Sequence, residues 1–121
     1  MSNACLYAIL RHEGVDRPHF DLMFQIKPGG KLATWRAEVW RPTGPIAVER
    51  IGDHRQAYLT FEGKLSGNRG SVRRVEQGIC EIEIQAEGWW KVWLKPAPKD
   101  DELILRLEDS RCVPIKGPHG D

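Results

Sequence analysis

The chain has 121 residues, the usual length of one domain, and its 40% hydrophobic and 29% charged residues are typical of a globular protein. A formal net charge of +1 excludes the broad basic surface of strongly cationic nucleic-acid-binding domains, so any phosphate contact must come from local clusters. No apolar run approaches the ~20 residues that span a bilayer, and the first ten residues lack the pattern of a signal peptide. We therefore expect one cytoplasmic domain, residues 1–121, that is not associated with a membrane.

The cysteines, Cys5, Cys80 and Cys112, are odd in number and widely spaced, and they form no C-x-x-C pair. This pattern argues against both a disulfide framework and a structural zinc site. We expect all three thiols to be reduced.

Short stretches of alternating apolar residues predict strands, and helical spacing is scarce. In the stretch FDLMFQI, one face carries the apolar side chains, and we expect the face with Asp21, Met23 and Gln25 to be the polar one. Strands are predicted at 6–10, 20–26, 31–40, 46–51, 70–76, 78–85, 89–95 and 102–108. Residues 53–63 are expected to be irregular or one helical turn, and an irregular tail is expected from about 109.

Eight short strands favour an all-β fold, either a barrel or a sandwich. Our prediction is a small antiparallel β-barrel of about eight strands with at most one short helical turn. In the stretch GWWKVWLK, Trp90, Val92 and Leu94 share one strand face and Trp89 and Trp93 the other. Packing in the core is the favoured interpretation, and a stacking platform for single-stranded nucleic acid is the alternative.

The stretch HEGVDRPHFD places two histidines and a carboxylate around a turn. If the flanking strands form a hairpin, His12 lies opposite His19, and Asp21 projects from the same face as His19 with its Cα ~6.5–7 Å away. Three ligands on one side with open positions on the other describe a catalytic metal site. The alternative is a set of solvated or hydrogen-bonded surface side chains. His119, in the tail, is assigned no role.

An ordered set of motifs lies within residues 12–63. A His is followed by a short loop, by His-aromatic-Asp, by a Trp after the next turn, and later by Asp-His, a Tyr and aromatic-Glu-Gly. The residues are His12, His19, Phe20, Asp21, Trp35, Asp53, His54, Tyr58, Phe61, Glu62 and Gly63. This order resembles the 3′-phosphoesterase domain of bacterial ATP-dependent DNA ligase D, which also occurs as a free-standing protein.

The resemblance implies a β-barrel that binds a divalent metal, usually Mn²⁺, through His12, His19 and Asp21, although Zn²⁺, Co²⁺ or Fe²⁺ suit the same ligands. It implies catalytic roles for His54 and Tyr58 on the phosphate. The implied activity is removal of a 3′-phosphate or 3′-ribonucleoside at DNA 3′ ends, on a primer-template or a broken duplex, during repair by non-homologous end joining. A separate ATP-dependent DNA ligase or repair polymerase is the implied protein partner.

Among the departures of the sequence from the family, two concern the binding of phosphate. Met23 and Ile46 stand where the family has arginines that bind phosphate. Other cations are candidates for that task, although solvated surface positions are the alternative interpretation. The favoured candidates are Arg17, Arg50, Arg55 and Arg74, and Arg69 and Arg73 are further candidates.

Two other functions compete with a phosphoesterase. The absence of the family's arginines at Met23 and Ile46 favours a catalytically weak relative that binds DNA ends or repair proteins. Two histidines and a carboxylate are also the ligand set of non-haem iron oxygenases.

Overall fold

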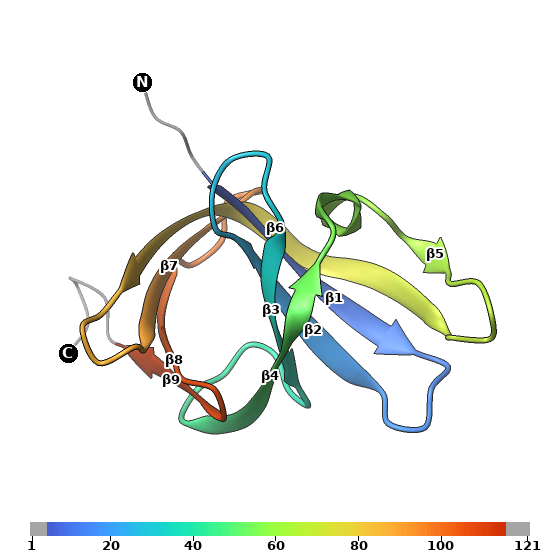
Figure 1. Cartoon of the computed structure of the whole chain (residues 1–121), viewed down its shortest axis with the longest axis horizontal. Helices are drawn as coiled ribbons and strands as arrows, with labels where there is room; N and C mark the ends of the chain where they lie inside the picture. The colour runs from blue at the N-terminus through green and yellow to red at the C-terminus, as the bar shows by residue number, and fades with distance from the viewer. Residues whose placement is uncertain (1–4, 116–121) are drawn as a thin grey trace.

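The computed structural model describes residues 5–115, which form nine strands and one short 3-10 helix (Figure 1). The elements in chain order are β1 (Cys5–Glu13), β2 (His19–Gln25), β3 (Leu32–Ala37), β4 (Ile46–His54), η1 (Gln56–Leu59), β5 (Gly63–Lys64), β6 (Ser71–Ile84), β7 (Trp90–Pro96), β8 (Leu103–Leu107) and β9 (Arg111–Ile115). No helix within this range is long and apolar enough to cross a membrane.

Eight of the strands close into an antiparallel barrel. Their order is β1-β2-β3-β4-β9-β8-β7-β6, and β6 pairs back with β1, while the short β5 pairs with the start of β6. The predicted fold, a small antiparallel barrel with one helical turn, is therefore confirmed.

Strand β6 corrects one boundary of the prediction. Two strands were expected on either side of Gln77 and Gly78, but residues 71–84 form a single strand. Gly78 lies opposite Tyr7 of β1 on one side and Pro96 of β7 on the other. A Cβ at this position would lie 2.2 Å from the backbone oxygen of Lys95. This glycine permits a close approach between strands and does not form a turn.

Strand β9 corrects a second boundary. The tail was expected to be irregular from about 109, yet residues 111–115 lie between β4 and β8 and complete the barrel. Cys112 is fully buried and pairs with Ile46 and Leu107. Pro114 is compatible with a strand here because β4 pairs with β9 only as far as Cys112, and no N–H is needed beyond that point. His119 lies outside the described residues.

The barrel interior holds the main core. Trp90, Val92 and Leu94 face it, and the Trp90 ring lies 5.3 Å from that of Trp35 in an edge-to-face contact. Core packing is therefore confirmed for this face of the tryptophan-rich strand. The fully buried members of this barrel core include Tyr7, Ile9, Leu22, Phe24, Trp35, Cys80, Val92, Leu94, Leu105, Leu107 and Cys112.

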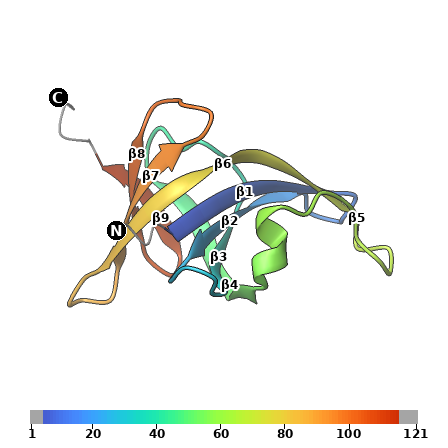
Figure 2. The same ribbon diagram turned by 90° about the horizontal axis from the view of Figure 1, so that it is seen from above.

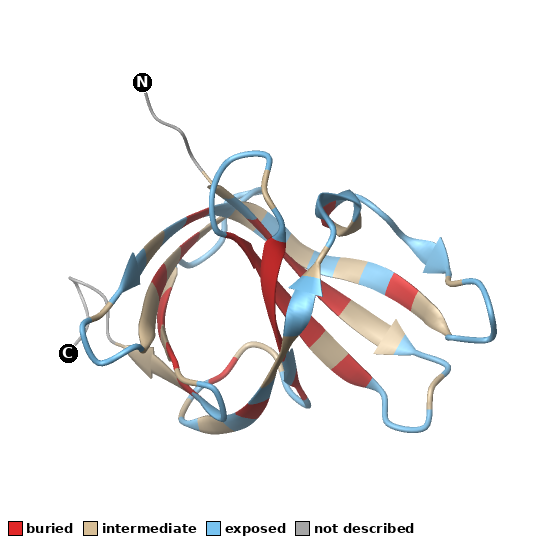
Figure 3. Cartoon of the chain, in the orientation of Figure 1, coloured by how far each residue is buried: buried red, intermediate tan, exposed pale blue. Residues whose placement is uncertain are grey.

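The outer face of β1–β3 is also buried, contrary to the expectation of a polar face along β2. Almost all of β2 is buried (Figure 3). The segment that follows β4, beginning with η1, lies against the outside of β1 and β2 (Figure 2). Together with these strands it encloses a second cluster, the outer core. The buried members of the outer core are Ala8, Leu10, Met23, Leu32, Leu59 and Val72, and Tyr58 and Leu65 pack against them. The predicted functional residues lie at the edge of this outer core.

Candidate metal centre

The β1–β2 hairpin brings two imidazoles and a carboxylate together. His12 pairs with His19, and Leu10 pairs with Asp21. Side chains of directly opposed antiparallel residues project to the same face, as do side chains two positions apart. His12, His19 and Asp21 therefore converge on the outer face, as the hairpin interpretation predicted.

The spacing of the three side chains suits a common ion. One potential ligand atom from each lies within 4.8 Å of the others. His19 Nε2 is 3.4 Å from Asp21 Oδ1, and His12 Nδ1 is 3.9 Å from Asp21 Oδ2. Ligands about 2.1 Å from a tetrahedral ion lie roughly 3.4 Å from one another, so the cluster is close to the required size.

Backbone carbonyls orient both histidines. His12 Nε2 donates to the carbonyl of Arg69 at 2.7 Å, and His19 Nδ1 donates to the carbonyl of Arg17 at 2.7 Å. In each neutral ring, the nitrogen that faces Asp21 is then left as a lone-pair donor. Histidines that bind metals are commonly held this way, because the outer hydrogen bond fixes both the tautomer and the ring orientation.

Two polar atoms at the centre of the cluster lack a hydrogen-bond partner among residues 5–115. His19 Nε2 and Asp21 Oδ1 are buried and form no hydrogen bond within the described part of the chain. Burying acceptor atoms without a donor is unfavourable, so this arrangement calls for a cation between them. These residues therefore fit a divalent metal, and two imidazoles with a carboxylate suit several first-row ions.

A cavity of about 140 Å³, the metal cavity, opens beside the cluster. It is lined by Leu10, His12, Asp21, Arg36, His54, Tyr58, Leu65, Arg69 and Val72. The two predicted catalytic residues thus meet two of the predicted ligands, His12 and Asp21, in this cavity. His54 ends β4, Tyr58 lies on η1, and their rings are 5.4 Å apart. His54 Nδ1 donates to the carbonyl of Gly52 at 3.2 Å, which leaves Nε2 to exchange a proton.

None of the four arginines that the sequence favoured lines the metal cavity. The Arg17 side chain is largely exposed and pairs with Glu38, although its carbonyl orients His19. Arg50 stacks on the indole rings of Trp35 and Trp90, at 4.4 and 5.0 Å.

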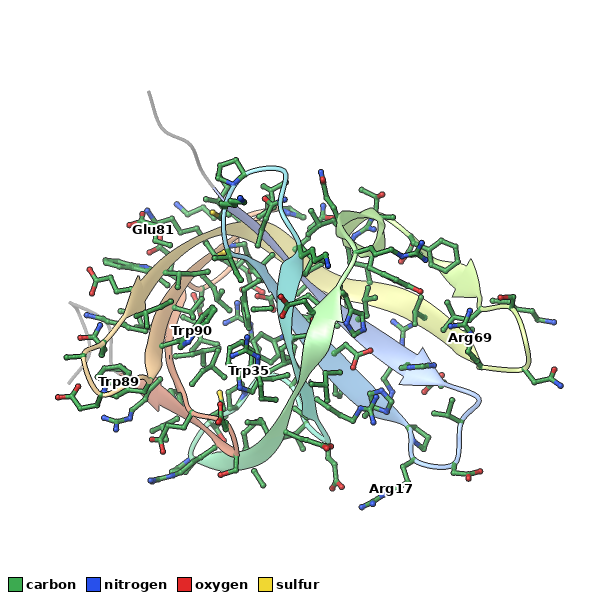
Figure 4. All side chains as sticks on the ribbon, viewed as in Figure 1. Arg17, Trp35, Arg69, Glu81, Trp89 and Trp90 are labelled. Carbon is green, nitrogen blue, oxygen red and sulfur yellow. The ribbon has the colours of Figure 1, made fainter. Side chains whose placement is uncertain are left out.

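The other two arginines lie around η1. Arg74 donates to the carbonyl of Leu59 at 3.3 Å, and Arg55 lies over the Tyr58 ring at 6.0 Å. Figure 4 shows Arg17 and Arg69 at the end of the molecule away from Trp35 and Trp90.

Two other arginines do line the metal cavity. Arg69 belongs to a stretch that the sequence pointed to, whereas Arg36 was missed. Arg36 lies directly opposite Asp21 in the β2–β3 register, and its Nε is 4.0 Å from Asp21 Oδ1. A signal was present, because strand alternation after the inward-facing Trp35 places Arg36 on the outer face.

The two positions where the ligase D family has arginines are apolar positions of the cores. Met23 is fully buried in the outer core, and Ile46 packs against the barrel core. Neither position can bind phosphate, so Arg36 and Arg69 are the cations available in the metal cavity.

The sequence matches no model of a known protein family and no curated protein. The resemblance to the ligase D domain therefore rests on the ordered residues themselves.

Proposed function

We propose that this protein is a divalent-metal-dependent phosphoesterase, with Mn²⁺ as the metal, that removes a 3′-phosphate or a 3′-ribonucleoside from DNA ends during break repair. The observation that carries the proposal is the pair of buried lone-pair donors, His19 Nε2 and Asp21 Oδ1. Asp21 lines the metal cavity together with Arg36 and Arg69. A site that pairs metal ligands with two guanidinium groups suits a phosphate ester. The resemblance to the ligase D domain supplies the DNA 3′ end.

The roles of the residues follow from their positions. His12, His19 and Asp21 would hold the ion, which when bound polarises a phosphoryl oxygen and lowers the pKa of a bound water. Arg36 would neutralise charge that develops on the phosphoryl oxygens. His54 Nε2 would exchange a proton with the attacking or leaving oxygen, and Tyr58 would donate a hydrogen bond from its hydroxyl.

The test is an end-trimming assay with the purified chain and MnCl₂. Its substrates are 5′-labelled primer-templates that end in a 3′-phosphate or in one 3′-ribonucleotide. We expect conversion to a 3′-hydroxyl end by the wild type, and loss of at least a hundredfold in rate for His19→Ala, because removing a ligand removes the metal chemistry. Persistence of the activity in His19→Ala would assign it to a contaminant.

A binding module for DNA ends is the second candidate. It is favoured by the apolar residues Met23 and Ile46, which replace two phosphate-binding arginines of the family. Metal binding with no trimming at high protein concentration would select this candidate. Oxygen consumption by the Fe²⁺-loaded protein would instead revive the oxygenase interpretation.

A further inference from the structure

A second cavity lies against the metal cavity, on the side of η1 and β5. We call it the basic groove. Its volume is about 320 Å³, and it is lined by Arg55, Ala57, Tyr58, Phe61, Lys64, Leu65, Ser66 and Arg69. Tyr58, Leu65 and Arg69 line both cavities, so the two are adjacent.

The basic groove carries uncompensated positive charge. Its lining includes three cations and no carboxylate. Within residues 5–115, neither Arg55 nor Lys64 takes part in an ion pair, and Arg69 donates only to Ser66. The adjacent Glu62 is turned away, because its carboxylate accepts the backbone N–H of Arg74 at 2.7 Å. A polyanion is the complementary ligand.

Aromatic rings make the groove suitable for bases. Phe61 remains 37% exposed, and its ring lies 6.0 Å from that of Tyr58 in an edge-to-face contact. Exposed aromatic faces beside cations bind unstacked bases, whereas a base inside a duplex has no face to offer.

We propose that the basic groove binds the single-stranded segment that leads to the terminal phosphate in the metal cavity. The direction of the strand, with its end in the metal cavity, rests on the proposed function. Binding of a single strand by the groove does not depend on that function. A strand end bound at the metal cluster would continue over Tyr58 and Arg69, and its preceding nucleotides would lie along Arg55, Phe61 and Lys64. The groove would thereby favour frayed or single-stranded ends over blunt duplex.

The test measures binding of a 5′-fluorescein-labelled dT12 oligonucleotide to the full chain by fluorescence anisotropy, in EDTA and over a range of salt. For Arg55→Ala/Lys64→Ala, we expect at least tenfold weaker binding and a salt slope smaller by about 1.4, since each phosphate contact contributes roughly 0.7 on single strands. For Phe61→Ala, we expect about tenfold weaker binding with the salt slope unchanged.

A matched control removes two positive charges elsewhere, in Lys91→Ala/Lys99→Ala, and its binding should equal that of the wild type. Equal weakening in this control, wild-type affinity in the groove variants, or tighter binding of blunt duplex than of dT12 would each overturn the proposal. Hydrolysis of bis(p-nitrophenyl) phosphate with MnCl₂ reports on the metal centre alone and should be unchanged in all three variants. Weaker dT12 binding in the groove variants therefore supports the binding role of the groove even if the wild type hydrolyses no phosphoester. Absence of hydrolysis by the wild type would overturn only the proposed function.

Discussion

At the scale of single residues, Asp21 combines two properties that rarely occur together. Its carboxylate is 4% exposed, and Oδ1 has no hydrogen-bond donor within the described residues. A buried carboxylate oxygen without a hydrogen-bond donor is unfavourable, and the Arg36 guanidinium 4.0 Å away compensates it less than a bound cation would. We therefore expect Asp21 to lower the stability of the metal-free protein and to raise that of the metal-bound protein.

Asp21→Asn should therefore change the free energy of unfolding in opposite directions, relative to the wild type, without and with metal. In EDTA, we expect a free energy of unfolding equal to or above that of the wild type, because the amide can donate to His19 Nε2. With MnCl₂ at a hundredfold excess over the wild-type Kd, the wild type should gain about 2.7 kcal/mol and the variant far less. Urea unfolding measures both.

Asp53→Asn is the matched control, since Asp53 pairs with Arg50 and does not line the metal cavity. It should retain the full stabilisation by Mn²⁺. Equal stabilisation of Asp21→Asn would contradict the assignment of Asp21 as a ligand.

Arg36 allows a second prediction at this scale, because it lines the metal cavity without belonging to the group of three potential ligands. We expect Arg36→Ala to slow phosphoester hydrolysis about a hundredfold, the usual loss when a donor to a developing oxyanion is removed. Mn²⁺ affinity should rise or stay constant, since a cation 4.0 Å from Asp21 Oδ1 competes with the metal. Arg36→Lys should recover part of the rate but not the bidentate contact.

Steady-state kinetics and Mn²⁺ titration separate these effects, with Lys99→Ala as the control. A parallel fall of rate and Mn²⁺ affinity in Arg36→Ala would show that Arg36 acts on the metal cluster rather than on phosphate.

At the scale of elements, Gly70 fixes the β5–β6 turn against the end of β1. Its φ is +82°, and a Cβ would lie 2.1 Å from the carbonyl oxygen of Glu13. We expect Gly70→Ala to lower the free energy of unfolding by ~2 kcal/mol or more, through left-handed strain and the clash together. It should also weaken Mn²⁺ binding, because the displaced turn takes the Arg69 carbonyl away from His12 Nε2.

Gly67→Ala isolates the strain. Gly67 has a φ of +72° in the same turn, and nothing lies within 4 Å of an added Cβ. We expect a loss of ~1 kcal/mol and unchanged Mn²⁺ affinity, as measured by urea unfolding and metal titration. Equal loss of affinity in both variants would contradict the role of the Arg69 carbonyl.

Elements that depend on local alternation could be predicted, and those that depend on distant packing could not. The β1–β2 hairpin, and with it the convergence of His12 and His19, follows from period-two side-chain geometry. The burial of Met23 does not, because it depends on Leu59 and its neighbours in η1 covering that face from outside. The position of Arg36 beside Asp21 was missed because it depends on the register between β2 and β3, which the sequence alone does not fix.

At the scale of the whole molecule, the barrel core encloses two thiols. Burial raises the pKa of Cys80 and of Cys112 from an ordinary value of 9.0 to about 12. A pKa raised in the folded state means that stability is complete below pH 9 and is lost as the pH rises from 9 toward 12, because the unfolded chain releases these protons first.

We therefore expect the free energy of unfolding to fall above pH 9 by at most ~1.4 kcal/mol per pH unit for each thiol. Cys80→Ala/Cys112→Ala should flatten this slope, even though it costs some stability at pH 7 through lost packing. Burial and hydrogen bonding to Glu76 also raise the pKa of Tyr7, so a residual slope should begin above pH 10. An unchanged slope between pH 9 and 10 in the double variant would contradict this account.

None of the strand pairs that close the eight-stranded barrel involves residues 55–70. This segment nevertheless supplies Tyr58, the lining of the basic groove and the Arg69 carbonyl that orients His12. The lining of the basic groove thus comes from a segment that the barrel does not need for its closure, whereas Asp21 and Arg36 of the metal cavity come from barrel strands. The group that orients His12 is a main-chain carbonyl, which every amino acid provides. Exposed side chains of this segment can therefore change without altering the group that orients His12, whereas Leu59 is held by the outer core and Gly70 by its close approach to Glu13.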